Sequence, residues 1–256
     1  MYLGRLGQAQ ETLRRAADRK LEMPDFVVQR YDVAFLESDD AAMARELALA
    51  QSDPEAEDWI SHHEAFVLAH TGHVREARKL SVQAGELARQ AGHRERAALF
   101  ETGAALREAF IGNAPAARQR ASVALELARG REVQYGTALA LALAGNSSQA
   151  QALADDLERA FPEDTSVKFS YLPVLRGVLA LNQHQPSKAI ELLQGASAYE
   201  LGTPRSNLQG FFGALYPVYV RGARHISRQV REPMLSLNSR RFLTTVELWS
   251  ATSLAH

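Results

Sequence analysis

The sequence contains no cysteine, which excludes disulfide bonds and any thiolate metal site. It has no marked excess of either charge, because 29 Lys and Arg residues face 30 Asp and Glu residues. A balanced charge argues against a dedicated nucleic-acid-binding protein. No apolar run approaches the roughly 18 residues of a membrane span, and the N-terminal stretch MYLGRLGQAQ is too polar for a signal peptide. These absences favour a soluble, cytoplasmic protein that does not act on nucleic acids or membranes.

Alanine, leucine, arginine and glutamate dominate the composition of the chain. Windows such as residues 77–91 and 150–161 place apolar residues three and four positions apart, as a one-sided helix requires. No window alternates apolar and polar residues for long enough to predict a sheet. The phrases SDPE, IGNAP, AGNSS and FPEDT interrupt the helical pattern. The sequence therefore predicts an all-α protein built of short helices in antiparallel pairs.

A spacing recurs along the chain, in which a turn residue is followed five positions later by a small or apolar residue. Successive turn residues are 31 to 40 positions apart. This interval indicates a repeat architecture of two helices per unit. The pairs are Ser38 and Met43, Gly72 and Ala77, Gly112 and Ala117, Gly145 and Ala150, and His184 and Ala189, with Gly7 and Thr12 as a weaker first pair.

Small residues also stand at two further fixed offsets from these turns. A small side chain lets two helix axes approach closely, whereas a bulky one would wedge the hairpin open. Seven positions before four of the turns come Ala65, Ala105, Ala138 and Gly177. Seven positions after the second member of each pair come Ala50, Ala84, Ala124, Leu157 and Ala196.

This spacing resembles the tetratricopeptide repeat (TPR), and Pro162 stands where that family places its terminating proline. Tyr31 at a small-residue position and His184 at a turn position depart from the family pattern. The resemblance implies an α-solenoid of TPR-like antiparallel helix pairs that forms a right-handed superhelix. We expect the array to cover residues 1–226, with the first repeat truncated at its start.

A narrower resemblance lies toward the end of the chain, in the phrases AIELLQGASAYELG and GALYPVYVRG. They are similar to the C-terminal TPR region of bacterial serine/threonine kinases and kinase-like sensors. The sequence itself has no glycine-rich nucleotide loop, no catalytic His-Arg-Asp and no Asp-Phe-Gly, so we do not expect an enzyme. The resemblance implies a protein-binding scaffold from the sensing region of such a protein. Two alternatives stay open, the regulatory arm of a transcription activator and an enzyme that uses the histidine-rich helix.

The repeat register ends near Ile226, and residues 227–256 are rich in Ser, Thr and Arg. We interpret this segment as a non-repeat tail, either an out-of-frame translation of a longer gene or a divergent C-terminal cap. A terminal repeat without its second helix would leave an apolar face uncovered, which predicts self-association.

The stretch ISHHEAFVLAHTGH, residues 60–73, contains half of the chain's 8 histidines. His63 and His70 share a helix face but lie about 10 Å apart along the axis, too far for one ion. His70 and His73 are separated by Gly72, where we expect the helix to end. The sequence therefore predicts no metal site, catalytic residue or cofactor.

The same register assigns one side of each first helix to a partner-binding groove. Such a face is apolar and aromatic, and it lacks the Lys and Asn residues that hold a terminal carboxylate in some TPR proteins. We therefore expect the partner to be an apolar helix or an extended segment of another protein. The predicted groove residues are His62, Phe66, His70, Thr102, Leu106, Phe110, Tyr135, Leu139, Val174 and Val178.

Overall fold

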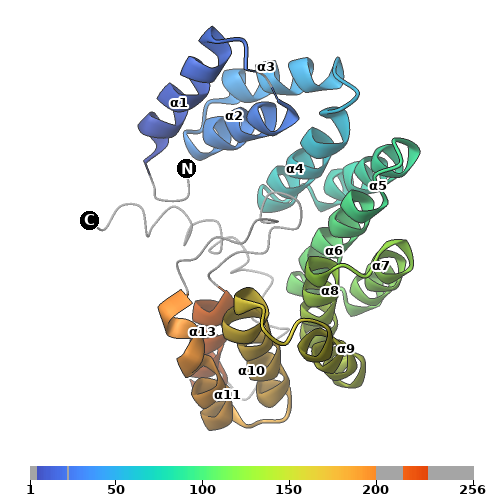
Figure 1. The fold of residues 1–256 in the computed structure, drawn as a ribbon, viewed down its shortest axis with the longest axis vertical. Helices are drawn as coiled ribbons and strands as arrows, with labels where there is room; N and C mark the ends of the chain where they lie inside the picture. The colour runs from blue at the N-terminus through green and yellow to red at the C-terminus, as the bar shows by residue number, and fades with distance from the viewer. Residues whose placement is uncertain (1–4, 22, 200–215, 230–256) are drawn as a thin grey trace. The chain divides into compact units, whose positions relative to one another are not determined.

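The structure, a computed structural model, describes residues 5–21, 23–199 and 216–229, and the side chains of these up to residue 222. Every regular element in these ranges is a helix, which confirms the all-α prediction (Figure 1). The described residues separate into two compact units. Unit 1 ends at His93 and unit 2 begins at Arg94.

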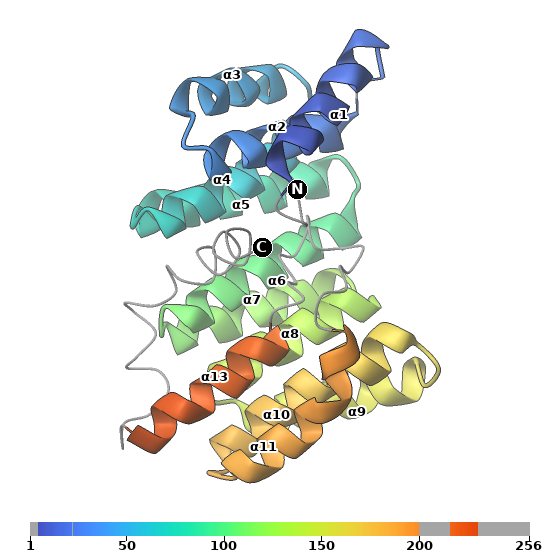
Figure 2. The same ribbon diagram turned by 90° about the vertical axis from the view of Figure 1, so that its left-hand side faces the viewer.

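Unit 1 consists of consecutive helices that pack on their neighbours in the chain. Helix α2 contacts α1, α3 and α4, and α4 forms a close pair with α5 (Figure 2). Pro24 stands at the first position of α2, where its missing N–H costs no helical hydrogen bond. The elements are α1 (Leu6–Asp18), α2 (Pro24–Leu36), α3 (Asp40–Gln51), α4 (Glu57–His70) and α5 (Val74–Gln90).

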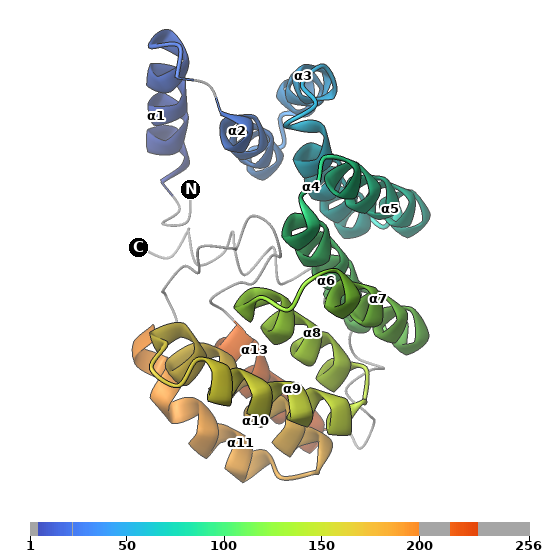
Figure 3. The same cartoon turned by 45° about the vertical axis from the view of Figure 1, so that its right-hand side comes forward.

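Unit 2 repeats this arrangement with three further hairpins, α6/α7, α8/α9 and α10/α11 (Figure 3). The first helices of successive hairpins also touch, because α8 contacts both α6 and α10. Helix α13 packs on α10 and α11. The elements are α6 (Arg94–Phe110), α7 (Ala114–Leu127), α8 (Arg131–Leu143), α9 (Ser147–Ala160), the π-helix η1 (Val167–Tyr171), α10 (Leu172–Asn182), α11 (Pro186–Leu193), the 3₁₀ helix η2 (Gln194–Tyr199) and α13 (Tyr216–Gln229).

The hairpin turns share one backbone geometry, the Schellman motif. After α4, for example, the N–H of Gly72 donates to the carbonyl of Ala69 and the N–H of His73 to that of Leu68. This motif needs a left-handed residue at the position of Gly72. All five main turn predictions are confirmed by positive φ angles: Ser38 (58°), Gly72 (89°), Gly112 (81°), Gly145 (78°) and His184 (58°).

Two further Schellman turns and one misplaced turn lie outside the predicted set. Lys20 (φ 58°) and Gly92 (φ 81°) end α1 and α5 in the same geometry. Gly7 is not at a turn, because it is the second residue of α1. The prediction at Gly7 was wrong because a glycine in the first turn of a helix costs little, and the apolar pattern of α1 extends across it.

The left-handed conformation of His184 leads to a stability prediction. A residue with a Cβ is strained there by about 1–2 kcal/mol, and the entropy cost of glycine is about 0.5–1 kcal/mol, so we expect His184→Gly to stabilise unit 2 by about 0.5–1 kcal/mol. Gly145→Ala, at an equivalent turn, should destabilise it by about 1 kcal/mol. Urea unfolding followed by circular dichroism measures both changes. Equal signs for the two variants would contradict the assigned turn geometry.

The small residues of the repeat pattern lie in the helix interfaces. All of the residues at the two small-residue offsets are buried, and so are the second members of four turn pairs. Met43 is only half-buried, and Tyr31, at a small-residue position, is buried despite its size. At Gly177 an added Cβ would lie 3.4 Å from both Leu193 Cγ and Val220 Cγ1, so α11 and α13 both pack closely on α10 at this position.

The structure describes only part of the predicted C-terminal region. Helix α13 continues to Gln229, beyond the boundary expected at 226. Gly222 is exposed, and no heavy atom of the described residues lies within 4 Å of a Cβ built on it. Its small size is therefore not required by a neighbouring helix among these residues. The rest of the predicted tail, residues 230–256, lies outside the described residues.

Within the described ranges no helix is long and apolar enough to cross a membrane.

Candidate functional site

In unit 1 the predicted groove residues His62, Phe66 and His70 lie on α4, one turn or two turns apart. His62 is fully buried, and its ring meets that of Phe66 edge-on with centroids 5.3 Å apart. His70 is half-buried and meets Phe35 of α2 edge-on at 5.4 Å. The three side chains thus pack among rings of their own unit, and Phe66 and His70 keep part of their surface exposed.

The neighbouring residue His63 makes a side-chain contact with a carboxylate that the sequence did not predict. Its Nδ1 lies 2.8 Å from Oδ1 of Asp32 on α2, and the imidazole is almost completely buried. Tyr31 is next to Asp32 in the chain and is also buried. Its pKa is raised by burial first and then by the nearby charges of Glu64 and Asp32. The side chains of α2 and α4 therefore enclose a polar cluster, which we call the α2–α4 cluster: Tyr31, Asp32, His63 and Glu64.

The α2–α4 cluster does not have the form of a metal site. A structural zinc site needs about four converging nitrogen, sulfur or oxygen ligands. Among the residues that the structure describes, no group of three or more His, Cys, Asp or Glu side chains could hold a metal ion. The contact between His63 and Asp32 instead joins two helices, which is a structural role for this imidazole.

Glu64 makes the stability of unit 1 depend on pH. Burial raises the pKa of its carboxyl. When the pKa of a carboxyl is higher in the folded state than in the unfolded state, the protonated carboxyl favours folding. This contribution is fully present below the pKa of the unfolded state, about 4.3, and it is lost as the pH rises through the pKa of the folded state. We expect Glu64→Gln to stabilise unit 1 at pH 7 and to have no such effect at pH 4, measured by thermal unfolding. Glu86→Gln, on the exposed side of α5, is the control and should show no difference between the two pH values. A benefit of Glu64→Gln that is equal at both pH values would contradict this account.

In unit 2 the remaining predicted groove residues lie on the first helices of the hairpins and are buried. Helix α6 carries Thr102, Leu106 and Phe110, α8 carries Tyr135 and Leu139, and α10 carries Val174 and Val178, with exposed fractions of 0–4%. The structure therefore brings them into the interior of unit 2, where α8 lies between α6 and α10.

Polar groups are buried along the same helices. The hydroxyls of Thr102 and Thr137 lie 3.4 Å apart across α6 and α8. Arg107 and Glu108 on α6 are also buried, although guanidinium and carboxylate groups are rarely fully buried in proteins. Glu108 accepts a hydrogen bond of 2.8 Å from the amide of Asn113. The buried faces of α6 and α8 therefore carry more polar side chains than the sequence analysis predicted for the groove.

Aromatic rings from four elements meet in unit 2. Tyr135 stacks on Tyr171 of η1, with centroids 3.9 Å apart and planes 7° apart. Phe110 stacks on Tyr216 of α13 at 6.1 Å and meets Tyr219 edge-on at 5.4 Å. Burial, together with the nearby Tyr216 and Tyr171, raises the pKa of Tyr135 well above its ordinary value. We call these five residues the aromatic cluster.

The π-helix η1 places Tyr171 in this cluster. Pro173 has no N–H to donate to the carbonyl of Phe169, so an ordinary α-helical ladder cannot run through this point. The N–H of Leu172 instead donates to the carbonyl of Val167, five residues back. Asp164 caps the start of this segment, because its Oδ1 accepts a 3.0 Å hydrogen bond from the N–H of Val167. The sequence signal was Pro173 within an otherwise helical stretch.

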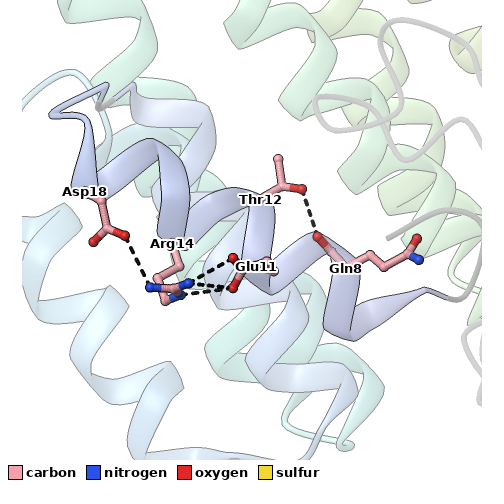
Figure 4. Close-up of polar contacts among 5 residues, drawn as sticks. All are labelled: Gln8, Glu11, Thr12, Arg14 and Asp18. Carbon is pink, nitrogen blue, oxygen red and sulfur yellow. Dashed lines mark hydrogen bonds and ion pairs between the residues drawn. The ribbon is translucent and has the colours of Figure 1, made fainter.

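The charged network on α1 is a surface feature. Arg14 donates to Glu11 and Asp18 on the same helix, and Thr12 donates to the carbonyl of Gln8 (Figure 4). The side chains of the three charged residues are more than half exposed. Exposed pairs at these spacings contribute little to stability and do not form a site.

Comparisons with protein-family models, with curated proteins and with solved structures found no match for this chain.

Proposed function

We propose that this chain is a non-catalytic protein-binding module, part of the sensing region of a kinase-like signalling protein. The observation that carries the proposal is the regular succession of helix pairs, each closed by a Schellman turn where the repeat spacing requires one. Chains of this kind bury their core between neighbouring pairs and leave the long faces of their helices for partners.

The buried small residues support a TPR-like architecture for these pairs. Ala65, Ala105, Ala138 and Gly177 occupy the same position in successive first helices, and each is buried. A regular interface of small residues is typical of stacked hairpins, and it supports the interpretation of the chain as an α-solenoid.

The partner in this proposal is a protein segment, either an apolar helix or an extended segment. Its binding residues in unit 1 are Phe66 and His70, which keep exposed surface on α4. Aromatic side chains that remain partly exposed beside an apolar core are common anchors for peptide partners. The binding is to side chains rather than to a terminal carboxylate.

Selection from a displayed library of 16-residue peptides tests the proposal. We expect enriched peptides with apolar residues at helical spacing, and a Kd in the micromolar range by fluorescence anisotropy. Phe66→Ser should weaken the binding by at least about tenfold. Val82→Ser, an exposed position on α5 of the same unit, is the matched control and should leave the Kd unchanged.

Far-UV circular dichroism of both variants establishes that they remain folded. Failure to enrich any peptide, or equal binding by the Phe66→Ser and Val82→Ser variants, would reject the proposed module.

A further inference from the structure

Helix α13 is in contact with residues that the repeat register assigns to the partner. Phe110 of α6 stacks on Tyr216 and meets Tyr219, although α6 and α13 are separated in the chain by the hairpins of α8 and α10. Tyr216 also lies near Tyr135. Phe110 and Tyr135 are therefore covered in part by a helix of the same chain.

The same helix packs against the last hairpin of unit 2. Val220 lies over Gly177 of α10, where an added Cβ would be 3.4 Å from Val220 Cγ1. Figure 2 shows α13 running alongside α10, and both α10 and α11 contact it. One side of α13 thus carries Tyr216, Tyr219 and Val220 onto the unit, and Gly222 is exposed.

This side of α13 has the chemistry expected of a partner. Tyr216 and Tyr219 are three positions apart, so both rings lie on one face of the helix, with Val220 beside them. A helix that presents apolar anchors at such spacings is the usual ligand of a hydrophobic groove. Two helices cannot pack against the ring of Phe110 at the same time, so a partner helix that binds there has to displace α13.

We propose that α13 occupies the partner-binding face of unit 2 in cis, as an autoinhibitory contact, and that the partner is a helix with two aromatic residues three positions apart. This inference rests on the proposed protein-binding function and identifies both the partner chemistry and the regulation of the site. Its residues are Phe110 and Tyr135 on the receiving side and Tyr216 and Tyr219 on the occupying side.

A peptide with the sequence of residues 216–229, acetylated and labelled with fluorescein, tests the competition in trans. The chain of residues 1–256 with Tyr216→Ala and Tyr219→Ala should bind this peptide at least about tenfold more tightly than the unmodified chain does. Gly222→Ala is the control, because Gly222 is exposed on the same helix and no heavy atom of the described residues lies within 4 Å of a Cβ built there; it should behave like the unmodified chain. A peptide that itself carries both tyrosine-to-alanine changes should bind neither chain. Equal binding by the double variant and the unmodified chain, or no binding by the double variant, would overturn the proposal.

Hydrogen exchange on the unmodified chain tests the same contact without any substitution. A library peptide that binds unit 2 should accelerate exchange of the amides of residues 216–229, because it displaces α13. Unchanged or slower exchange there would overturn the cis contact. Enriched peptides that depend on Phe66, together with equal binding of the 216–229 peptide by the double variant and the unmodified chain, would leave the protein-binding function intact and remove only the autoinhibition.

Discussion

Replacing Ala150 with leucine is expected to lower the free energy of unfolding of unit 2 by about 2–3 kcal/mol, near the upper end of the usual cost of overpacking. Ala150 is fully buried on α9, at the small position five residues after the Gly145 turn. Helix α9 packs closely on α8 there, and leucine would force the two helices apart. Urea unfolding followed by circular dichroism measures the loss.

Ala152 provides the control on the same helix. It is exposed, so Ala152→Leu should change the free energy of unfolding by less than about 0.5 kcal/mol. The two substitutions add the same atoms to the same helix and differ only in the face they occupy. Similar losses for both would contradict the small-residue register of the hairpins.

Replacing Asp32 with alanine is expected to destabilise unit 1 by about 2–3 kcal/mol. The imidazole of His63 is almost completely buried, and the 2.8 Å contact with Asp32 compensates for part of the cost of burying it. Removing the carboxylate takes this compensation away. Trp59, buried on α4 in the same unit, reports the unfolding by fluorescence when Trp249 is replaced by phenylalanine in every variant.

The control for this substitution is Asp18→Ala on α1. Asp18 forms an ion pair with Arg14, but both side chains are more than 60% exposed. We expect no measurable change in the unfolding midpoint, because solvent screens such a pair. A loss for Asp32→Ala no larger than that for Asp18→Ala would show that the buried pair does not stabilise the contact between α2 and α4.

The turns and the small-residue positions could be predicted because their signals are local. A Schellman turn is specified by one left-handed residue and the helix before it, so even Ser38 and His184 could be placed from their spacing alone. Gly7 was placed wrongly because the same spacing there competes with a continuous helical pattern. Local sequence predicts backbone geometry well when no competing pattern extends across the turn.

The α2–α4 cluster and the aromatic cluster could not be predicted in the same way. Asp32 and His63 are 31 residues apart, and nothing in either segment indicates its partner. Phe110 and Tyr216 come from helices that only the packing of the hairpins between them brings together. The repeat spacing predicted Phe110 and Tyr135 as residues of the partner-binding groove, but it did not indicate that α13 covers them.

The most direct test of the central claim, that the first helix of each pair forms the partner-binding face, is hydrogen exchange with and without a saturating library-selected peptide. We predict slower exchange in the first helices of the pairs that the peptide contacts, among α4, α6, α8 and α10, and unchanged exchange in the second helices α5, α7 and α9. Protection confined to the second helices would contradict the account.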